Sequence, residues 1–436
     1  MTSRKQLKVR VRARMARTGE SYSTALRHVA GPAPAARVDD GQGYRLRGGV
    51  HPESACVADV LAHHGVGAGG AELTEALVFG AAGGPGAGYI LWEFAHDDSR
   101  PVVLGFSSQW QYHDRAVLGC LDRLGVPARV HRTAGRVGAA RALAECVADG
   151  LPALVWPDRA GLGYRHLPSS LDGMGGHPVV VHGRSGDDHL VDDRTLARLS
   201  VPVDQLDAAR ARVGSYRNLL VAPEPTGDVP VPRLQEALRS GIGDCVARLG
   251  GTSTSFALPV WRKWARLMTD ARAEKGWPRV FADGRGLVDA LASVWEGASP
   301  AGMTGGHLRD LTADMLDQAG PVLDTSLDGA AAAWREAAAA WHEVAETALP
   351  IDVPAFATLR ELTVAVQESI TADGDAGRAD AARDAARLWA LRAELSAEPP
   401  LGAAERTDLF AALADTLSRV HAAERAAVDA LRVLSD

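Results

Sequence analysis

Two short segments about 120 residues apart decide the fold. Residues 49–56 read GVHPESAC, and residues 175–181 read GGHPVVV and lead into LVDD at 190–193. Pro52 suits the first turn of a helix, where a missing N–H is tolerated, and Gly65 suits the stop that follows it. The valine run after His177 is typical of a buried strand. The order is therefore a helix start, a strand that begins at a His, and a second strand that ends in Asp.

This order matches what acyl transfer through a thioester requires. A thiol at a helix N-terminus has a lowered pKa, a neighbouring His deprotonates it, and an Asp orients that His. Backbone N–H groups at the same helix end stabilise the oxyanion. Here the helix starts with Pro52, which cannot be a nucleophile, and Cys56 follows one turn later on the same face. Two readings of Cys56 stay open: a displaced nucleophile or a small buried helix residue.

The polar residues of these segments are the candidate site. We expect His177 to act as a base or to bind substrate, the alternative being a structural His. Asp192 is the predicted orienting carboxylate, unless it is a turn residue paired with Arg194. His51 and Glu53 are predicted to bind substrate, although Glu53 in the first turn also complements the helix dipole. No spacing in these residues indicates a metal site, so we predict neither a metal nor a cofactor.

The loop at residues 80–88, GAAGGPGAG, is a second candidate for substrate contact. It lacks the Gly-Lys-Ser/Thr ending of a phosphate-binding loop. Because glycines let a ligand approach the backbone, Gly84, Gly86 and the following Tyr89 are predicted to line the pocket. The competing interpretation is tight backbone packing beside the first helix.

The chain divides into three predicted parts, a basic extension at 1–40, an α/β-patterned domain at 41–224 and an all-helical domain at 225–436. The Pro-rich stretch at 222–232 marks the second boundary. In the middle part we expect helices at 52–64, 114–124, 136–149 and 203–212, and strands at 89–94, 102–106, 128–130, 152–156, 178–182, 189–192 and 218–221. In the last part we expect helices at 233–250, 259–276, 286–296, 306–319, 325–348, 354–372, 376–395 and 401–434. Five tryptophans at helical spacing are predicted core residues, namely Trp261, Trp264, Trp334, Trp341 and Trp389.

Composition limits the protein class. The 436 residues are 46% hydrophobic and contain no apolar run long enough to span a bilayer, and the N-terminus lacks the features of a secretory signal. The four cysteines are scattered, without a CxxC pair, which favours a reducing cytoplasm over a disulfide scaffold or a zinc knuckle. The abundance of Ala, Arg and Gly is typical of GC-rich bacterial genomes.

Charge is unevenly distributed along the chain. Residues 1–28 hold eight Lys or Arg and one acid, so this segment carries +7, and the remainder must carry −14 for the chain to total −7. Residues 1–30 are predicted to form a helix, a turn and a short second helix. A basic extension can bind nucleic acid, a membrane surface or an acidic partner, or dock on its own acidic body. We expect docking or solvation, because a basic helix without aromatics is a weak nucleic-acid signal.

The segments quoted above resemble the butirosin biosynthesis protein H N-terminal family and, more distantly, peptidases that trim bacteriocin leaders. Further matches are LTEA at 73–76, the 79–89 loop, and LVDD at 190–193. Residues 225–436 resemble the helical domain of unknown function that often follows this family. The resemblance implies an α+β papain-like N-terminal domain followed by an all-α domain. Counting back from Gly65, the family's nucleophilic Cys falls on Pro52.

The resemblance also implies a function. The best-known member of the family moves an aminoacyl group from a carrier-protein thioester to an aminoglycoside amine, so we expect an acyltransferase-like, cytoplasmic protein of antibiotic or other specialised metabolism. The implied partners are a small-molecule or peptide substrate and a carrier protein, with neither nucleic acid nor a membrane; homo-oligomer formation stays open. If Cys56 is not the nucleophile, His177 and Asp192 would assist direct attack of an amine on a thioester. The alternative is a non-catalytic binding or scaffold protein on a degenerate papain-like fold.

Overall fold

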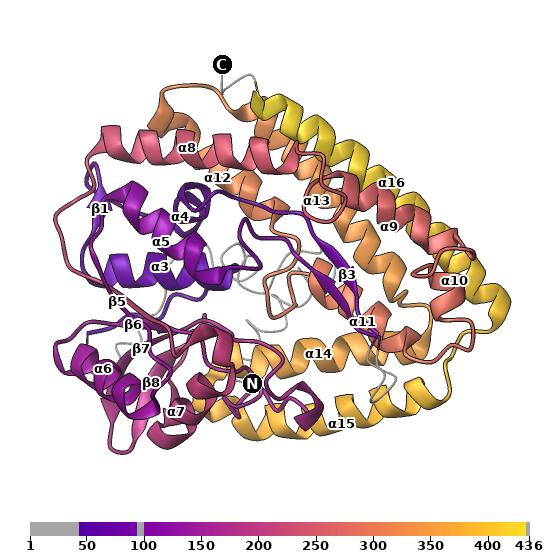
Figure 1. The fold of residues 1–436 in the computed structure, drawn as a ribbon, viewed down its shortest axis with the longest axis horizontal. Coiled ribbons are helices and arrows are strands. Elements are labelled where there is room, and N and C mark those ends of the chain that lie inside the picture. Colours follow the sequence, from indigo (N-terminus) through magenta and orange to yellow (C-terminus); the bar gives the residue numbers. More distant parts are fainter. Residues whose placement is uncertain (1–42, 94–99, 433–436) are drawn as a thin grey trace, which may run out of the picture. The chain divides into compact units, whose positions relative to one another are not determined.

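The chain forms two compact units that are each discontinuous in sequence. The computed structural model describes residues 43–93 and 100–432 (Figure 1). The first unit holds the described residues up to Val78 together with Val117–Leu234 and Thr363–Arg387. The second holds Phe79–Ala116, Gln235–Leu362 and the chain from Leu388. The predicted helix-turn-helix at 1–30, like the whole extension at 1–40, lies outside the described residues. The boundary at 224/225 stays a prediction, but residues 79–116 and 363–387 each belong to the unit opposite to the one expected.

A six-stranded antiparallel sheet is the centre of the first unit. Its order is β5-β10-β6-β7-β8-β9, so the last strand inserts between two earlier ones. The strands are β5 (Ala128–His131), β6 (Ala153–Val155), β7 (Val179–Ser185), β8 (Asp188–Asp192), β9 (Leu199–Pro202) and β10 (Leu220–Pro223). The strand β9 was not predicted, and the turn between β7 and β8 is shorter than expected. It comprises Gly186 and Asp187, with Gly186 in the left-handed region at φ 60°.

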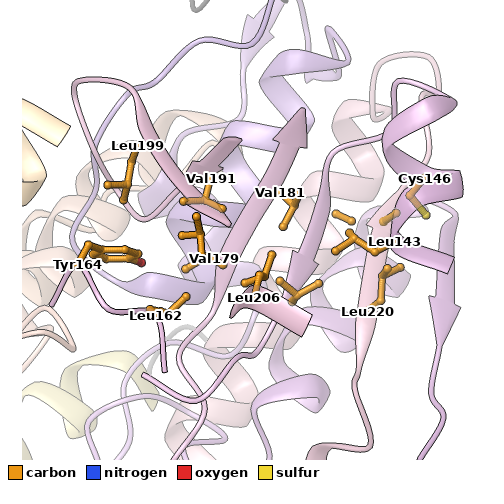
Figure 2. Close-up of a cluster of buried hydrophobic side chains, with 14 of the residues drawn as sticks. Leu143, Cys146, Leu162, Tyr164, Val179, Val181, Val191, Leu199, Leu206 and Leu220 are labelled. Carbon is orange, nitrogen blue, oxygen red and sulfur yellow. The ribbon is translucent and has the colours of Figure 1, made fainter. Parts of the chain in front are cut away.

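Helices cover both faces of this sheet. The helices α6 (Arg136–Ala148) and α7 (Val203–Arg212) pack on one face, where side chains of alternate strand residues form the core shown in Figure 2. This face includes Val179, Val181 and Val191, and Ile370 and Ala381 from the third segment of the unit complete it. The helix α3 (Pro52–His63) contacts β6, β7 and β10 from the other face (Figure 1). Strand alternation therefore decides which polar residues face α3 and which face away.

The start and end of α3 follow the sequence pattern. Pro52 occupies the first turn, and Gly65 has φ 67°, as expected for the residue after a helix C-terminus. The remaining small elements of the N-terminal region are β1 (Gly67–Ala68), β2 (Ala71–Glu72), α4 (Glu75–Ala81), β3 (Tyr89–Leu91), β4 (Val102–Leu104) and α5 (His113–Leu124). The strands β3 and β4 pair with each other in the second unit and not with the six-stranded sheet.

The second unit is built mainly from helices. They are α8 (Val231–Leu249), α9 (Pro259–Thr269), α10 (Trp277–Val280), α11 (Leu287–Ala298), α12 (Arg309–Leu323), α13 (Asp328–Ala348), α14 (Pro354–Asp373), α15 (Arg378–Ala397) and α16 (Ala403–Arg432), of which α8, α14 and α15 extend into the first unit. This confirms an α+β N-terminal region followed by a largely helical part. None of the helices within the described residues has both the length and the apolar content of a membrane span.

Buried tryptophans dominate the core of this unit. Trp261, Trp264, Trp334 and Trp341 are fully buried, as predicted, whereas Trp389 is only half-buried and packs beside the Arg392 guanidinium. Glu424 accepts hydrogen bonds from the indole N–H groups of Trp261 and Trp341. The same carboxylate pairs with Arg309, and both charged side chains are fully buried. A fully satisfied polar group thus lies inside an otherwise apolar helical core.

The predicted helix at 259–276 ends early, at Thr269, because Asp270 stops α9, and the next helix, α10, begins only at Trp277. The Asp270 carboxylate accepts the N–H groups of Arg272 and Ala273, which gives the backbone an alternative to helical hydrogen bonds. The other helices differ from the predicted ranges by a few residues at their ends. The helix α12 continues through Pro321 and stops at Asp324, whose φ is 53°.

Candidate functional site

The helix start that the sequence singled out carries no nucleophile. His51 is the N-cap residue of α3, with extended backbone angles, and its Nδ1 lies 2.8 Å from Oγ of Ser54. Pro52 follows at the first helical position. A proline supplies neither a thiol nor a backbone N–H at this position. A helix that begins with proline therefore lacks, at this position, two groups that a thioester-forming site uses, an attacking atom and an oxyanion donor.

The neighbouring N–H groups are occupied by a carboxylate of the same unit. Glu75, at the start of α4, accepts the N–H of Val50 at 2.8 Å and that of His51 at 2.6 Å through the same oxygen. On the other side of the ring, Nε2 of His51 lies 3.1 Å from Glu53. A carboxylate at a helix N-terminus is favoured by the unsatisfied N–H groups and the helix dipole. Glu75 thus fills a position that an anionic group of a substrate would otherwise take.

His177 lies just before β7, in a fully enclosed polar cluster. Its side chain is 6% exposed, and its Nε2 lies 2.7 Å from Oδ1 of Asp193. Burial lowers the pKa of His177 to about 4, and the positive charges of Arg165 and Arg194 act in the same direction while Asp193 opposes them. The ring is therefore neutral at pH 7.

Asp193 is held as a carboxylate by several donors. Tyr164 donates its hydroxyl to Oδ2 at 2.7 Å, and Arg165 forms a buried ion pair with the same oxygen. Arg194 lies 3.8 Å from Oδ1. Burial by itself would raise the pKa of Asp193, but Arg165 and His177 outweigh it and hold the pKa well below its ordinary range. The carboxylate is therefore charged at neutral pH.

The contacts of Asp193 determine the tautomer of His177. Asp193 is an acceptor, so a neutral His177 places its proton on Nε2 and donates it to Asp193. Arg165 also lies 3.0 Å from Nε2, and it donates to Asp193 and, at 3.2 Å, to Oε1 of Gln367. The lone pair of Nδ1 is then the basic position of the ring. A His oriented by a buried carboxylate in this way is the arrangement of a general base.

The prediction that Asp192 orients His177 is wrong. Asp192 accepts the hydroxyl of Tyr44 at 3.2 Å and the N–H of Thr195 at 3.1 Å. It is opposite Val180 in the β7–β8 register, on the sheet face that α3 covers. Successive strand residues point to opposite faces, so the next residue, Asp193, follows the face of Val191 and Val181 instead.

The same alternation explains why Asp193 meets His177. His177, Val179 and Val181 are alternate residues and so face the same side of the sheet, and Val181 pairs with Val191. Asp193 is two residues after Val191 and so follows the same face. This depends on a shift in the β7–β8 register between Val181 and Gly183, which the sequence pattern does not show. Tyr164 and Arg165 were missed as well, since they lie in a loop with no periodic pattern, and only the fold brings them to Asp193. Arg194, the alternative partner predicted for Asp192, donates to the Val50 carbonyl at 2.8 Å and lies 3.8 Å from Oδ1 of Asp193.

The comparison with protein families concerns this same stretch of chain. Residues 51–194 match the family model described as Butirosin biosynthesis protein H, N-terminal. This part of the chain is similar to that family. The match begins at the N-cap of α3 and ends directly after Asp193, so it includes the helix start and the His–Asp pair. The comparison with curated proteins gives no significant match.

Within the region that matches this family model, the surroundings of Cys56 oppose its activation. The side chain is 3% exposed, and none of the described residues forms a hydrogen bond with its Sγ. Burial raises the pKa of the thiol well above its ordinary value, and the negative charges of Asp192 and Asp59 add to this effect more than Arg194 offsets it. A thiol in such a position stays protonated and behaves as a small buried helix residue.

The other carboxylates near Cys56 form a group of their own. Asp59, on α3, shares a hydrogen bond with Asp192, and burial together with the charge of Asp192 raises the pKa of Asp59 well above its ordinary value. Two adjacent buried carboxyl groups avoid repulsion by sharing a proton. Tyr44 stacks on His182 at 4.2 Å between ring centroids while it donates to Asp192. This group lies on the sheet face that α3 covers. The alternation of strand residues assigns His177 and Asp193 to the opposite face.

The glycine loop belongs to the second unit, where packing within that unit explains each predicted residue. A Cβ on Gly86 would lie 2.1 Å from the carbonyl oxygen of Ser107, and its own carbonyl accepts from Arg309 at 2.8 Å. Gly84 has φ 63°, which favours glycine. Tyr89 is buried, stacks on Trp264 and accepts the indole N–H of Trp277 at 2.9 Å. A substrate-binding role for Gly84, Gly86 and Tyr89, like that of His51 and Glu53, stays a prediction.

Proposed function

We propose that this chain promotes acyl transfer in specialised metabolism by direct attack of an amine on an acyl thioester, without a covalent acyl-enzyme. The observation that supports this proposal is the buried His177–Asp193 pair within the family region, with Nε2 of the ring 2.7 Å from the carboxylate. The family suggests a biosynthetic, acyltransferase-like function. The identity of the base and its orienting group, His177 and Asp193, is our inference from the geometry.

In the proposed step, the amine nitrogen attacks the thioester carbonyl carbon, and the carbon–sulfur bond breaks as the amide forms. Nδ1 of His177 takes the proton that the amine loses, and the leaving thiolate receives a proton in return, so that charge is balanced. Asp193 stabilises the imidazolium that forms transiently and fixes the ring. With a pKa of about 4, His177 is always in the basic form at neutral pH, although it is a weak base.

The absence of an enzyme nucleophile motivates the direct route. Pro52 stands where the resemblance places the family's Cys, and Cys56 is buried among carboxylates that keep it protonated. A displaced Cys56 nucleophile would need a thiolate, which this environment disfavours. Direct attack needs only a positioned amine and a base, since holding the two reactants together accounts for much of the rate.

The test is an acyl-transfer assay on the full chain. We would incubate it with an aminoacyl N-acetylcysteamine thioester and an aminoglycoside probe, and measure amide product by mass spectrometry. We expect product with wild type and with Cys56→Ala, and a loss of at least about 100-fold in His177→Ala, since general-base catalysis contributes about that much. A persistent acyl adduct on the intact wild-type protein that disappears in Cys56→Ala would contradict the proposal.

A second candidate is a non-catalytic protein that binds an acyl carrier or a small molecule. It is favoured by one observation, that Glu75 occupies the N–H groups of Val50 and His51 at the helix start. A binding protein does not need free N–H groups to stabilise an oxyanion. The contact of Glu75 with these N–H groups is therefore compatible with a binding role. The two candidates are separated by the same assay: the second predicts saturable binding of the thioester with no amide product, and equal affinity in wild type and His177→Ala.

A further inference from the structure

Three potential metal ligands meet in the second unit, in a region that the acyl-transfer proposal does not use. His307 lies two residues before α12, Asp310 is in the first turn of that helix, and His342 is on α13, which packs along α12. The ligand atoms of the three side chains all lie within 4.8 Å of one another. Across the described residues, no other group of three His, Cys, Asp or Glu side chains converges in this way.

The distances are close to those of a metal site. Oδ2 of Asp310 lies 3.0 Å from Nε2 of His342 and 3.7 Å from Nε2 of His307. A tetrahedral Zn²⁺ with bonds of about 2.0–2.2 Å separates its ligand atoms by about 3.3–3.6 Å. The two imidazole rings are 4.7 Å apart between centroids and inclined at 55°, so they do not stack. Shifts of a few tenths of an ångström would bring the three atoms into a coordination sphere.

His307 provides an independent indication of a ligand. Its side chain is 1% exposed, and its Nε2 has no hydrogen-bond partner. A buried polar atom without a partner costs free energy, and such atoms are rare in native structures. This Nε2 is on the side of the ring that faces Asp310, at 3.7 Å, which is beyond hydrogen-bond reach. A cation bound between the two residues would satisfy both.

We propose that His307, Asp310 and His342 bind a divalent transition-metal ion, with Zn²⁺ as the best match. Two imidazoles and one carboxylate are ligands that Zn²⁺ accepts in tetrahedral sites, whereas Mg²⁺ and Ca²⁺ prefer oxygen alone. Three protein ligands leave the fourth position for water or for a group of a substrate. The side chains of Asp310 and His342 are 50% and 28% exposed, so solvent reaches the site from this side.

Metal binding would rearrange two hydrogen bonds. Nδ1 of His307 now accepts the N–H of Arg309 at 3.1 Å, which places the ring proton on Nε2. Ligation through Nε2 moves that proton to Nδ1, so the contact with Arg309 is given up. His342 exchanges its hydrogen bond to Asp310 for the metal bond, with its remaining proton on Nδ1. The first turn of α12 is therefore the part of the backbone that should respond to the metal.

The test is a titration of the full chain, freed of metal by chelation, with ZnCl₂ in a calorimeter. The variants are Asp310→Asn, His342→Gln and their combination, because both residues are partly exposed and their replacement should preserve the fold. The matched control is His421→Gln, a half-buried His on α16 outside the cluster. We expect one Zn²⁺ equivalent to be lost in the double variant and retained in the control, with each single change lowering affinity by at least about tenfold.

A second readout identifies the ligands. Co²⁺ in place of Zn²⁺ should give visible absorption bands of a tetrahedral site in wild type and in His421→Gln, and these bands should be lost in the double variant. Zn²⁺ stoichiometry and Co²⁺ spectra that are the same in wild type and the double variant would overturn the proposal. The absence of Zn²⁺ binding to wild type at millimolar concentration would overturn it as well, and would leave His342–Asp310 as an ordinary surface ion pair. None of these outcomes depends on acyl transfer.

Discussion

Asp193 lies 2.7 Å from Nε2 of His177 and is at the same time the acceptor for Tyr164 and Arg165. The carboxylate therefore has two tasks. It orients the imidazole, and it balances the charge of a fully buried guanidinium. Removing one partner from a buried ion pair leaves the other charge uncompensated, whereas a surface pair contributes little.

The first prediction concerns Asp193→Asn, which keeps the shape of the side chain but removes its charge. We expect a loss of about 3–5 kcal/mol in the free energy of unfolding, because Arg165 is left without its counter-ion. The control is Asp172→Asn, which breaks the half-exposed pair with Arg212 and should cost no more than about 1 kcal/mol. Urea unfolding followed by circular dichroism measures both. Equal stabilities of the two variants would contradict the assigned network.

Asp192 provides the matched test of which carboxylate orients His177. In Asp192→Asn, the amide oxygen in place of Oδ1 still accepts the N–H of Thr195, and the amide NH2 in place of Oδ2 can donate to the hydroxyl oxygen of Tyr44. If the amine-transfer proposal holds, this variant should retain amide formation, whereas Asp193→Asn should lose it even where it remains folded. The ratio of the two rates in the thioester assay is the measurement. A greater loss in Asp192→Asn would restore the pairing expected from the sequence.

The pKa of His177 leads to a pH prediction. It is about 4 in the folded protein and about 6.5 in the unfolded chain, so the unfolded state binds more protons between these values. Stability from this residue is fully present above pH 6.5 and falls as the pH is lowered toward 4, by about 3 kcal/mol in total. Other buried His residues contribute in the same window, so the difference between wild type and His177→Gln should be measured at pH 7 and pH 4.5. We expect the stability advantage of wild type to shrink at the lower pH.

The fourth prediction concerns the reactivity of Cys56. Burial and nearby carboxylates raise its thiol pKa, so it should react with iodoacetamide no faster than Cys120, a buried cysteine whose pKa burial raises to about 12. Peptide mapping by mass spectrometry after brief labelling at pH 7.5 compares the two in one sample, and labelling in urea gives the reference rate. If Cys56 is labelled many times faster than Cys120, this would support the hypothesis that Cys56 is a displaced nucleophile.

Much of the local structure was predictable because Pro and Gly mark it. Pro52 and Gly65 delimit α3, and the valine run after His177 gives β7. The error at Asp192 has a structural cause, because Ser185 pairs with Asp188 at the turn but the register shifts by one residue between Val181 and Gly183. Val181 is therefore opposite Val191, and Asp193 instead of Asp192 follows the face of His177. By contrast, the approach of Arg165 depends on a long loop. The assignment of residues 79–116 to the second unit depends on tertiary packing, such as that of Gly86 against Ser107, that no periodicity expresses. The pair His307 and Asp310 is visible as a three-residue spacing, but His342 joins it only through helix packing.

The last prediction restores a thiol at the helix start. In Pro52→Cys, the new side chain lies at the first helical position, where the dipole lowers a thiol pKa, although Glu75 partly offsets this effect. We expect the variant to form an acyl adduct with an aminoacyl N-acetylcysteamine thioester, detected as a mass increase of the intact protein. The control Pro52→Ser lacks the thiol and should form none. By strand alternation His177 and Asp193 belong to the sheet face opposite α3, but Arg194 links them to the helix start, since it lies 3.8 Å from Asp193 and donates to the Val50 carbonyl. If His177 acts as the base at this end of α3, the adduct should form much more slowly in Pro52→Cys with His177→Ala. Equal rates with and without His177 would show that its Nδ1 does not face the helix start, and would remove the basis for a shared site between them.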